Sequence, residues 1–164
     1  MPLIHGNKIN RTHQKIRVFV DHLRNIASLS ESSRLKVGAI AVKKNFQRDC
    51  FGYNGTVSNA NINPDTGTEE ESLEPGLSGF VHAEMNLIAK FREHDPENYV
   101  ILLTHSPCSV CAKLLINAEF ENIFWLEDYR DTSHIDKLFK GRVKNYGNID
   151  RLLTNGIATK VFNV

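Results

Sequence analysis

The sequence predicts an α/β fold in a single domain that spans residues 1–164. An amphipathic helix near the N-terminus and a later alternation of helical and strand patterns predict this class. The length of 164 residues, with 41% apolar and 24% charged residues, is in the range where one chain buries one continuous core. We therefore expect one domain of alternating helices and strands.

The first part of the chain predicts one helix followed by a β-hairpin. Apolar residues within 11–29 recur at steps of three and four, which places them on one stripe of a helix. Residues 36–43 are short and β-branched, and residues 48–53 run into the turn-forming pair Asn54-Gly55. We therefore expect two antiparallel strands directly after the helix.

A long loop and then alternating elements are expected beyond the hairpin. Residues 56–79 show no periodicity and are rich in Asn, Gly, Ser, Pro and Glu. Loops of this length are uncommon and often functional. Within this loop, we expect the run Glu69-Glu70-Glu71 to be a solvated face rather than a metal site. The later elements expected are helix 82–91, strand 99–104, helix 108–118, strand 122–127, helix 149–155 and, after Gly156, strand 157–162.

Composition restricts the possible partners of the chain. Its 20 basic and 19 acidic residues give a net charge of +1, so we expect no binding to duplex nucleic acid, whereas a small anionic ligand is compatible. No apolar run reaches the ~18 residues that span a bilayer, and the N-terminal segment has no apolar secretion signal. We expect a cytoplasmic protein without a membrane partner, in which the three cysteines are reduced.

Three residues form a candidate zinc site. A catalytic zinc ion takes three protein ligands, often sulfur and imidazole nitrogen, and leaves a fourth position for water. His82, Cys108 and Cys111 match that count. We expect Ser106 to cap a helix that Pro107 begins, with both thiols on one face of its first turn. A helix N-terminus also lowers thiol pKa values and favours the thiolate that a metal requires.

Glu84 is the candidate proton-transfer group. Side chains two positions apart point to different sides of a regular helix, so His82 and Glu84 converge only if His82 opens the helix. Glu84 is not needed as a ligand, and a carboxylate beside an activated water can act as general base and acid. The order His-x-Glu followed by Pro-Cys-x-x-Cys resembles the signature of zinc deaminases, in which such a site attacks C4 of cytosine.

Further motifs extend this resemblance over residues 11–135. They are Ser33-Arg34-Leu35-Lys36-Val37-Gly38-Ala39, Gly52-Tyr53-Asn54-Gly55, His82-Ala83-Glu84-Met85-Asn86, Ser106-Pro107-Cys108-Ser109-Val110-Cys111 and Asp128-Tyr129-Arg130-Asp131. Through them the chain resembles the deoxycytidylate deaminase branch of the cytidine and deoxycytidylate deaminase superfamily. The resemblance implies a three-layer α/β/α sandwich around a mixed five-stranded sheet, with the two metal-bearing helices side by side on one face. It also implies zinc-dependent hydrolysis of dCMP to dUMP and ammonia, which supplies the precursor of dTMP.

The resemblance also implies a set of substrate-binding residues. By likeness to the family, Asn54 binds the sugar hydroxyl, Ser106 contacts the base, and Tyr129 and Asp131 line the pocket beside the ring. Arg34 precedes the first strand, where a guanidinium group suits the 5′-phosphate. The plain alternative for Arg34 is a solvated loop arginine.

Two departures from the family pattern bear on regulation and on the number of metal ions. Relatives regulated by dCTP and dTTP commonly follow Gly-Tyr-Asn-Gly with a proline and a further glycine, whereas Thr56-Val57-Ser58-Asn59 follows here. A second, structural zinc in some relatives needs Cys and His ligands that residues 56–79 do not contain, so we expect one zinc per chain. The resemblance further implies a homo-oligomer, often a hexamer, and suggests Phe80 and the helix after His82 as interface elements.

Three alternatives remain open. One is a substrate preference for dCTP, or for both dCMP and dCTP, because no residue separates mono- from triphosphate. Another is action on a cytosine within a polynucleotide, since the same zinc and glutamate chemistry serves both substrates. The last is a non-catalytic zinc module with Cys50 as a fourth ligand, although a small buried strand residue is the commoner role for such a cysteine. We interpret His105 as a strand-end residue and Trp125 as a core aromatic.

Overall fold

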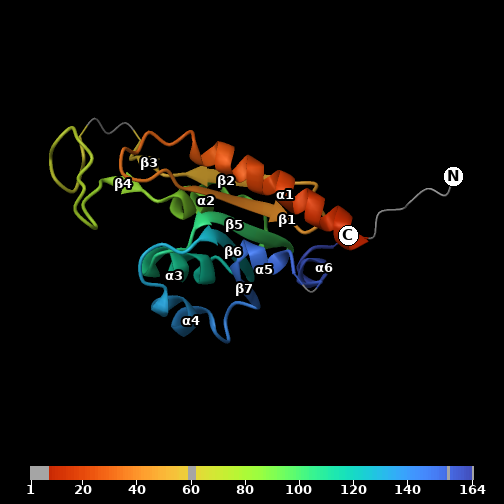
Figure 1. The fold of residues 1–164 in the computed structure, drawn as a ribbon. Helices are drawn as coiled ribbons and strands as arrows, with labels where there is room; N and C mark the ends of the chain where they lie inside the picture. The colour runs from red at the N-terminus through yellow and green to blue at the C-terminus, as the bar shows by residue number, and fades with distance from the viewer. Residues whose placement is uncertain (1–7, 59–61, 155, 164) are drawn as a thin grey trace.

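A mixed five-stranded sheet forms the centre of the computed structural model, which describes residues 8–58, 62–154 and 156–163 (Figure 1). The strands lie in the order β2-β1-β5-β6-β7. β1 is antiparallel to β2 and β5, whereas β5, β6 and β7 are parallel, so the predicted hairpin and the mixed sheet are both confirmed. The strands are β1 (Gly38–Lys43), β2 (Asp49–Tyr53), β5 (Tyr99–His105), β6 (Asn122–Glu127) and β7 (Asn145–Asn148).

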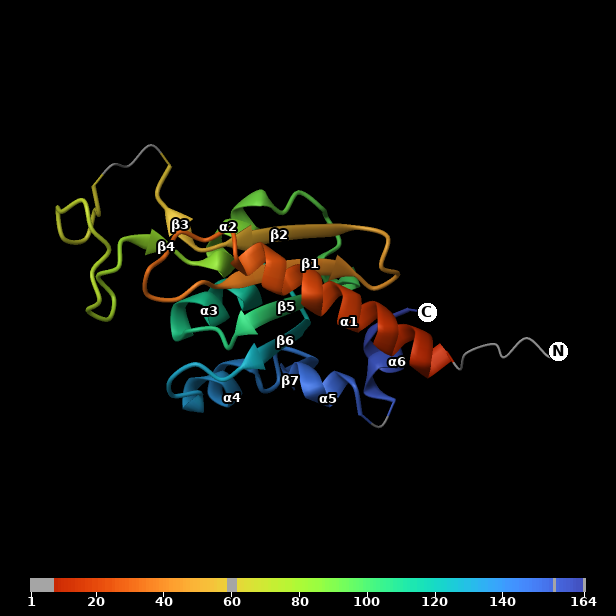
Figure 2. The same ribbon diagram turned by 45° about the horizontal axis from the view of Figure 1, so that its top comes forward.

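Helices cover both faces of this sheet and complete three layers (Figures 1 and 2). One face packs against α1 (Lys8–Ala27), α5 (Ile149–Leu152) and α6 (Ile157–Val161). The other face packs against α2 (Ala83–Lys90), α3 (Ser109–Asn117) and α4 (Ser133–Phe139). The predicted α/β/α sandwich, with α2 and α3 on the same face, is therefore confirmed.

Two-sided burial explains why the central strands are almost continuously apolar. Successive side chains of a strand point to opposite faces of the sheet. In β1, Ala39 and Ala41 join the core under α2, while Ile40 and Val42 join the core under α1. The same alternation runs through β5, and all four of these β1 side chains are fully buried. A strand covered on both faces has a short, almost continuous run of apolar residues, and this pattern made the strands predictable from the sequence.

Gly52 and Asn86 fix α2 close to the edge strand β2. A Cβ atom at Gly52 would lie 2.6 Å from the carbonyl oxygen of Ala83 and 2.6 Å from the backbone nitrogen of Leu87. The Asn86 side-chain amide donates a hydrogen bond of 2.9 Å to the carbonyl oxygen of Tyr53. These contacts set the position of α2, whose first turn bears the candidate site residues.

The loop before α2 projects from the end of the molecule opposite to α6 in both views (Figures 1 and 2). Within the predicted loop 56–79, residues 59–61 lie outside the described residues. The short strands β3 (Gly55–Thr56) and β4 (Phe80–Val81) pair with each other and bracket the loop. A short 3₁₀ helix, η1 (Pro96–Asn98), precedes β5.

The structure corrects the prediction for the C-terminal part. The expected strand 157–162 is wrong, because α6 occupies this segment and buries Ala158 and Val161 in the core that includes α1. The expected helix 149–155 is shorter, and Asn155 lies outside the described residues. α4 and β7 were not predicted. Among the described residues, no helix combines the length and the apolar character needed to cross a bilayer.

Candidate metal centre and active site

The three predicted metal ligands converge at the N-termini of α2 and α3. The ligand atoms of His82, Cys108 and Cys111 all lie within 4.8 Å of one another. His82 Nδ1 is 3.6 Å from Cys108 Sγ and 3.3 Å from Cys111 Sγ. Within the described part of the chain, no other group of three His, Cys, Asp or Glu side chains gathers in this way. One imidazole and two thiols at this spacing fit a zinc ion with an open fourth position.

The helix starts orient these ligands. His82 is the N-cap of α2, with an extended backbone at φ −67° and ψ 153°, so it opens the helix as predicted. Cys108 is the N-cap of α3, and its Sγ accepts a hydrogen bond of 3.4 Å from the backbone N–H of Cys111. The prediction that Ser106 caps α3 and that Pro107 begins it is wrong, because α3 begins at Ser109. Ser106 Oγ instead accepts a hydrogen bond of 2.8 Å from the backbone N–H of Tyr129.

Hydrogen bonds within the cluster separate the pKa values of the two thiols. A hydrogen bond from the Cys111 thiol, and a further one from His82, lower the pKa of Cys108 to about 3. The same contact, together with burial, raises the pKa of Cys111. The hydrogen bond to Cys108 also raises the pKa of His82. The cluster therefore presents a thiolate at Cys108, the ionised form that a metal binds.

Glu84 lies in the first turn of α2 and is 4% exposed. Burial is the main cause that raises the pKa of its carboxyl group, and the Cys111 thiol is its hydrogen-bond neighbour. Glu84 lines the same cavity as His82 and Cys108. A buried acid with a raised pKa beside a metal site has the properties of a general acid and base.

This cavity has a volume of about 500 Å³, which is in the range of small-ligand sites. All five residues predicted to bind substrate line it: Arg34, Asn54, Ser106, Tyr129 and Asp131. It opens at the carboxyl ends of the parallel strands β5 and β6, where ligands bind in many α/β proteins. Residues of the 62–79 loop, including Asp65 and Glu71, form another wall.

Asn54 also has a structural role in the wall of the cavity. Its side-chain oxygen accepts a hydrogen bond of 2.9 Å from the backbone N–H of Val37. Its amide group donates a hydrogen bond of 2.7 Å to the carbonyl oxygen of Leu35. An asparagine side chain has two amide protons and two acceptor positions, so one of each remains for a ligand.

Tyr129 and Asp131 lie on the connection after β6. Tyr129 is half-buried, and its ring meets His105 edge-on at 6.0 Å between centroids. Asp131 is exposed, and its carboxylate accepts hydrogen bonds of 2.9 Å and 2.8 Å from the backbone and hydroxyl of Ser133. Asp131 therefore also orders the start of α4.

Some residues of the cavity were not predicted. Arg130 lines it with its guanidinium 4.8 Å from the centre of the Tyr129 ring, and His134 lines it with Nε2 2.8 Å from the carbonyl oxygen of Pro107. His105 ends β5, as interpreted, but also lines the cavity, and burial lowers its pKa. Arg130 stands between two residues that the family motif had pointed to, so the signal for it was present.

The prediction that Glu69-Glu70-Glu71 is a solvated face is wrong for its last residue. Glu69 and Glu70 are exposed, but the Glu71 carboxylate hydrogen-bonds to the Ser32-Ser33 turn. Glu71 is separated in the chain from Ser32 by 39 positions and from Ser33 by 38 positions, so no local sequence pattern predicts this contact.

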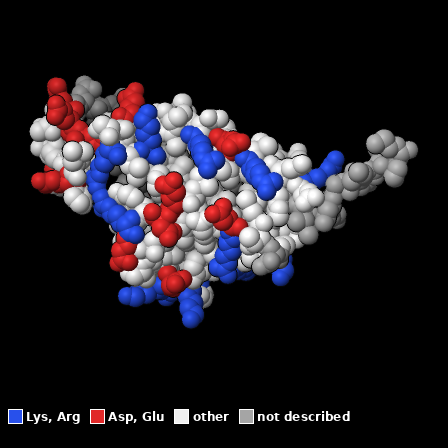
Figure 3. Space-filling view, viewed as in Figure 1, with Lys and Arg blue, Asp and Glu red and all other residues white. Residues whose placement is uncertain are grey.

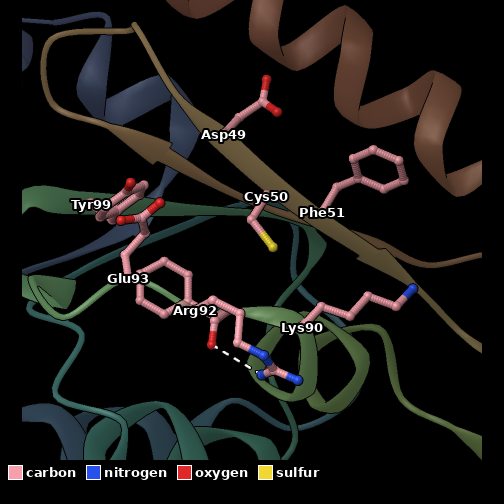
Figure 4. A pocket seen from close by; sticks show the side chains of 8 residues that line it. Asp49, Cys50, Phe51, Lys90, Arg92, Glu93 and Tyr99 are labelled. Carbon is pink, nitrogen blue, oxygen red and sulfur yellow. Dashed lines mark hydrogen bonds between the residues drawn. The ribbon is translucent and has the colours of Figure 1, made fainter.

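Cys50 does not join the metal cluster. It lines a different cavity of about 410 Å³ between β2 and the chain that follows α2, where Figure 4 shows its sulfur among Lys90, Arg92 and Tyr99. Burial raises the pKa of the Cys50 thiol. The alternative with Cys50 as a fourth ligand is therefore not supported. Trp125 is 6% exposed and belongs to the core, as interpreted.

Comparison with known proteins agrees with this geometry. Residues 13–127 match the family described as the cytidine and deoxycytidylate deaminase zinc-binding region. The chain belongs to the cytidine and deoxycytidylate deaminase family. The membership predicted from the motifs, and zinc as the metal suited to His82, Cys108 and Cys111, are thereby confirmed.

Over the aligned residues, two relatives are between a quarter and a third identical to this chain. It is 29% identical over 117 residues to ComE operon protein 2 of Bacillus subtilis, a match that covers 70% of this chain and 60% of that protein. It is 28% identical over 109 residues to human deoxycytidylate deaminase, which covers 65% of this chain and 61% of the relative. The chain thus spans about 60% of the length of the curated relatives it matches.

Solved structures support the same fold. A dCMP deaminase from the cyanophage S-TIM5, in complex with dCMP and dUMP, superimposes with a TM-score of 0.65 at 28% sequence identity. The superposition covers 82% of this chain and 96% of the phage deaminase. A diaminohydroxyphosphoribosylaminopyrimidine deaminase/5-amino-6-(5-phosphoribosylamino)uracil reductase from Thermotoga maritima, at 14% identity and a TM-score of 0.54, shares the fold alone.

Proposed function

We propose that this chain catalyses the zinc-dependent hydrolytic deamination of dCMP to dUMP and ammonia. The observation that carries the proposal is the buried acid Glu84, which lines one cavity together with the metal ligands His82 and Cys108. The cyanophage deaminase with dCMP and dUMP, which aligns over 82% of this chain, supports the choice of substrate. We infer that the described residues act as one deaminase domain.

Glu84 carries the protons in the proposed reaction. When bound, zinc supplies Lewis-acid activation of a water molecule, which makes that water a nucleophile near neutral pH. Glu84 accepts one water proton as the oxygen bonds to C4 of cytosine, and it passes this proton to N3. Glu84 then moves the proton of the new C4 hydroxyl to the amino group, which leaves as ammonia. The carboxylate is regenerated, and the raised pKa of Glu84 suits both transfers.

The cavity wall supplies the contacts proposed for the rest of the nucleotide. We assign the free donor and acceptor of Asn54 to the sugar hydroxyl, and the strand-end region at Ser106 to the base. Tyr129 and Asp131 flank the ring. Arg34, which lines the cavity, is assigned to the 5′-phosphate, for which a planar fork of donors is well suited.

The chain is further proposed to act as a cytoplasmic homo-oligomer, with a hexamer as the expected state. Val110 and Leu114 on α3 are 52% and 37% exposed, which leaves apolar surface for a second copy. Phe80 and α2 remain the proposed interface elements. Light scattering coupled to size-exclusion chromatography measures this state directly.

The proposed activity is tested by a panel of substrates. Purified protein is incubated with dCMP, CMP, dCTP and deoxycytidine, with and without a zinc chelator, while cytosine absorbance and ammonia release are followed. We expect chelator-sensitive turnover with dCMP preferred. Absence of turnover in protein that contains zinc would refute the proposal and favour a polynucleotide substrate, which single-stranded DNA containing cytosine then tests. Preference for dCTP would keep the reaction and change the substrate.

A further inference from the structure

The Glu71 carboxylate is bound in a small anion site made by the Ser32-Ser33 turn. Ser32 Oγ lies 2.8 Å and 3.0 Å from the two carboxylate oxygens of Glu71. One of these oxygens also accepts hydrogen bonds of 2.9 Å from the backbone N–H and 3.2 Å from the hydroxyl of Ser33. Two hydroxyl groups and one backbone N–H thus surround a single anion.

The donors of this site are fixed by the local chain. Ser32 is 5% exposed. Its Oγ accepts hydrogen bonds from the backbone N–H groups of Arg34, at 3.2 Å, and Leu35, at 3.1 Å. A hydroxyl has one proton to donate, and because its lone pairs are occupied by these N–H groups, that proton is left for Glu71. The turn is therefore built to donate to an anion, whichever anion is present.

The same contacts hold the 62–79 loop against the active-site cavity. Ser32, Arg34 and Glu71 all line the cavity that contains Glu84. Arg34 Nη1 donates a hydrogen bond of 3.3 Å to the carbonyl oxygen of Glu74, so the loop is held at two neighbouring points. Figure 3 shows acidic side chains at the end of the molecule where Figure 1 places this loop.

A bound nucleotide and Glu71 would compete for these donors. The proposed function assigns the 5′-phosphate to Arg34, next to the turn whose hydroxyl and N–H groups bind Glu71. A phosphate carries about −1.5 to −2 charges and accepts hydrogen bonds as a carboxylate does. Two anions at one set of donors repel each other, so a bound phosphate displaces Glu71, which is half-buried on the loop and becomes hydrated when it is released.

We propose that Glu71 is a specificity-determining residue that occupies the 5′-phosphate site until a nucleotide displaces it, and that it thereby lowers the affinity for nucleotides relative to nucleosides. This inference rests on the proposed function, because it places a cytosine nucleotide in this cavity. A nucleotide provides the anion that replaces Glu71 and frees the loop, whereas a nucleoside leaves the carboxylate and the loop in place. The competition therefore weakens the binding of a nucleotide and leaves the binding of a nucleoside unchanged.

The first test compares Glu71→Gln with Glu70→Gln, an exposed neighbour with the same change of charge. Glutamine keeps the size of Glu71 and removes the competing negative charge. We expect the KM of Glu71→Gln for dCMP to fall about tenfold with kcat unchanged, since hydrogen bonds to charged groups are the strong ones. The kinetics with deoxycytidine and those of Glu70→Gln should match the wild type. An unchanged or higher KM for dCMP in Glu71→Gln would overturn the inference.

The second test needs no turnover. Inorganic phosphate is added to the wild-type protein, with chloride at matched ionic strength as the control, and hydrogen exchange is measured in peptides from 62–79. We expect phosphate to speed exchange in this loop, and to have no such effect in Glu71→Gln. Phosphate that leaves the exchange of wild-type protein unchanged or slows it would contradict the displacement. If dCMP is not turned over at all, the proposed function fails, while this arm still decides whether Glu71 occupies an anion site.

Discussion

Gly52 offers a test of how strictly the position of α2 controls the site. A Cβ atom at this position would lie 2.6 Å from the Ala83 carbonyl oxygen and 2.6 Å from the Leu87 nitrogen. Ordinary contact begins near 3.4 Å, so the Gly52→Ala variant forces α2 away from β2 by about 0.8 Å. Both close atoms belong to the backbone of α2, so no side-chain rotation relieves the contact.

The expected effect on stability is a loss of about 1–3 kcal/mol, the usual cost of overpacking a core. The expected effect on catalysis is larger. α2 bears His82 at its N-cap and Glu84 in its first turn, while the thiol ligands are on α3. A shift near 1 Å between catalytic groups and the reacting atoms lowers rates on the order of 10²-fold. The kcat for dCMP should therefore fall by about this factor, with a lower Tm.

The matched control is Gly55→Ala, because a Cβ atom at Gly55 meets no heavy atom within 4 Å. Thermal unfolding, zinc content by atomic absorption and steady-state deamination are measured for both variants. Gly55→Ala should behave as the wild type in all three. A Gly52→Ala protein with wild-type Tm and turnover would refute the reasoning that contact between β2 and α2 sets the geometry of the site.

The other predictions concern the metal, the proton carrier and pH. Glu84→Gln should keep the fold and bind zinc but lose turnover by on the order of 10³-fold, since glutamine cannot transfer protons; near wild-type turnover would end the proposed mechanism. Cys111→Ser should lose zinc at equilibrium dialysis, whereas Cys50→Ser should retain it. The reverse result would show that zinc binds at Cys50 and not at Cys111. Burial lowers the pKa of His105 below 6.5, so the unfolded chain binds more protons just below that pH. Stability to urea should be full above pH 6.5 and decrease as the pH falls through that region, with a smaller decrease in His105→Gln; equal slopes in both proteins would exclude His105 as the cause.

The metal site was predictable from the sequence because zinc ligands are chemically distinctive. His82, Cys108 and Cys111 are residue types that few other roles place at these spacings, and each lies at a helix start, where local sequence is informative. The buried strands were predictable for a related reason, because β1 and β5 are apolar on both faces. These features depend on residue type and on local pattern.

The missed features depend on tertiary contacts. β7 has the polar sequence Asn-Tyr-Gly-Asn and is a strand because it pairs with β6. In α6, the β-branched residues favoured a strand, but Ala158 and Val161 are spaced three apart and pack on the side of the sheet covered by α1. Glu71 resembled any acidic loop residue until the turn at Ser32 was seen to receive it. Local preference is overridden where distant segments meet.

Cys108 shows why some residues of a site are conspicuous and others are not. Its Sγ accepts the N–H of Cys111 and so begins α3, which a serine hydroxyl would do equally well. The fold alone therefore does not require cysteine at this position. Cys108 Sγ also lies 3.6 Å from His82 Nδ1. A serine hydroxyl would be a poor replacement at this second contact, because zinc binds thiolate and imidazole. A cysteine at this position therefore indicates a metal site. Ser32, which binds an anion with a hydroxyl group, has the sequence pattern of an ordinary turn residue. The metal ligands were therefore visible in the sequence, whereas the contact of Glu71 with the Ser32-Ser33 turn became visible only in the fold.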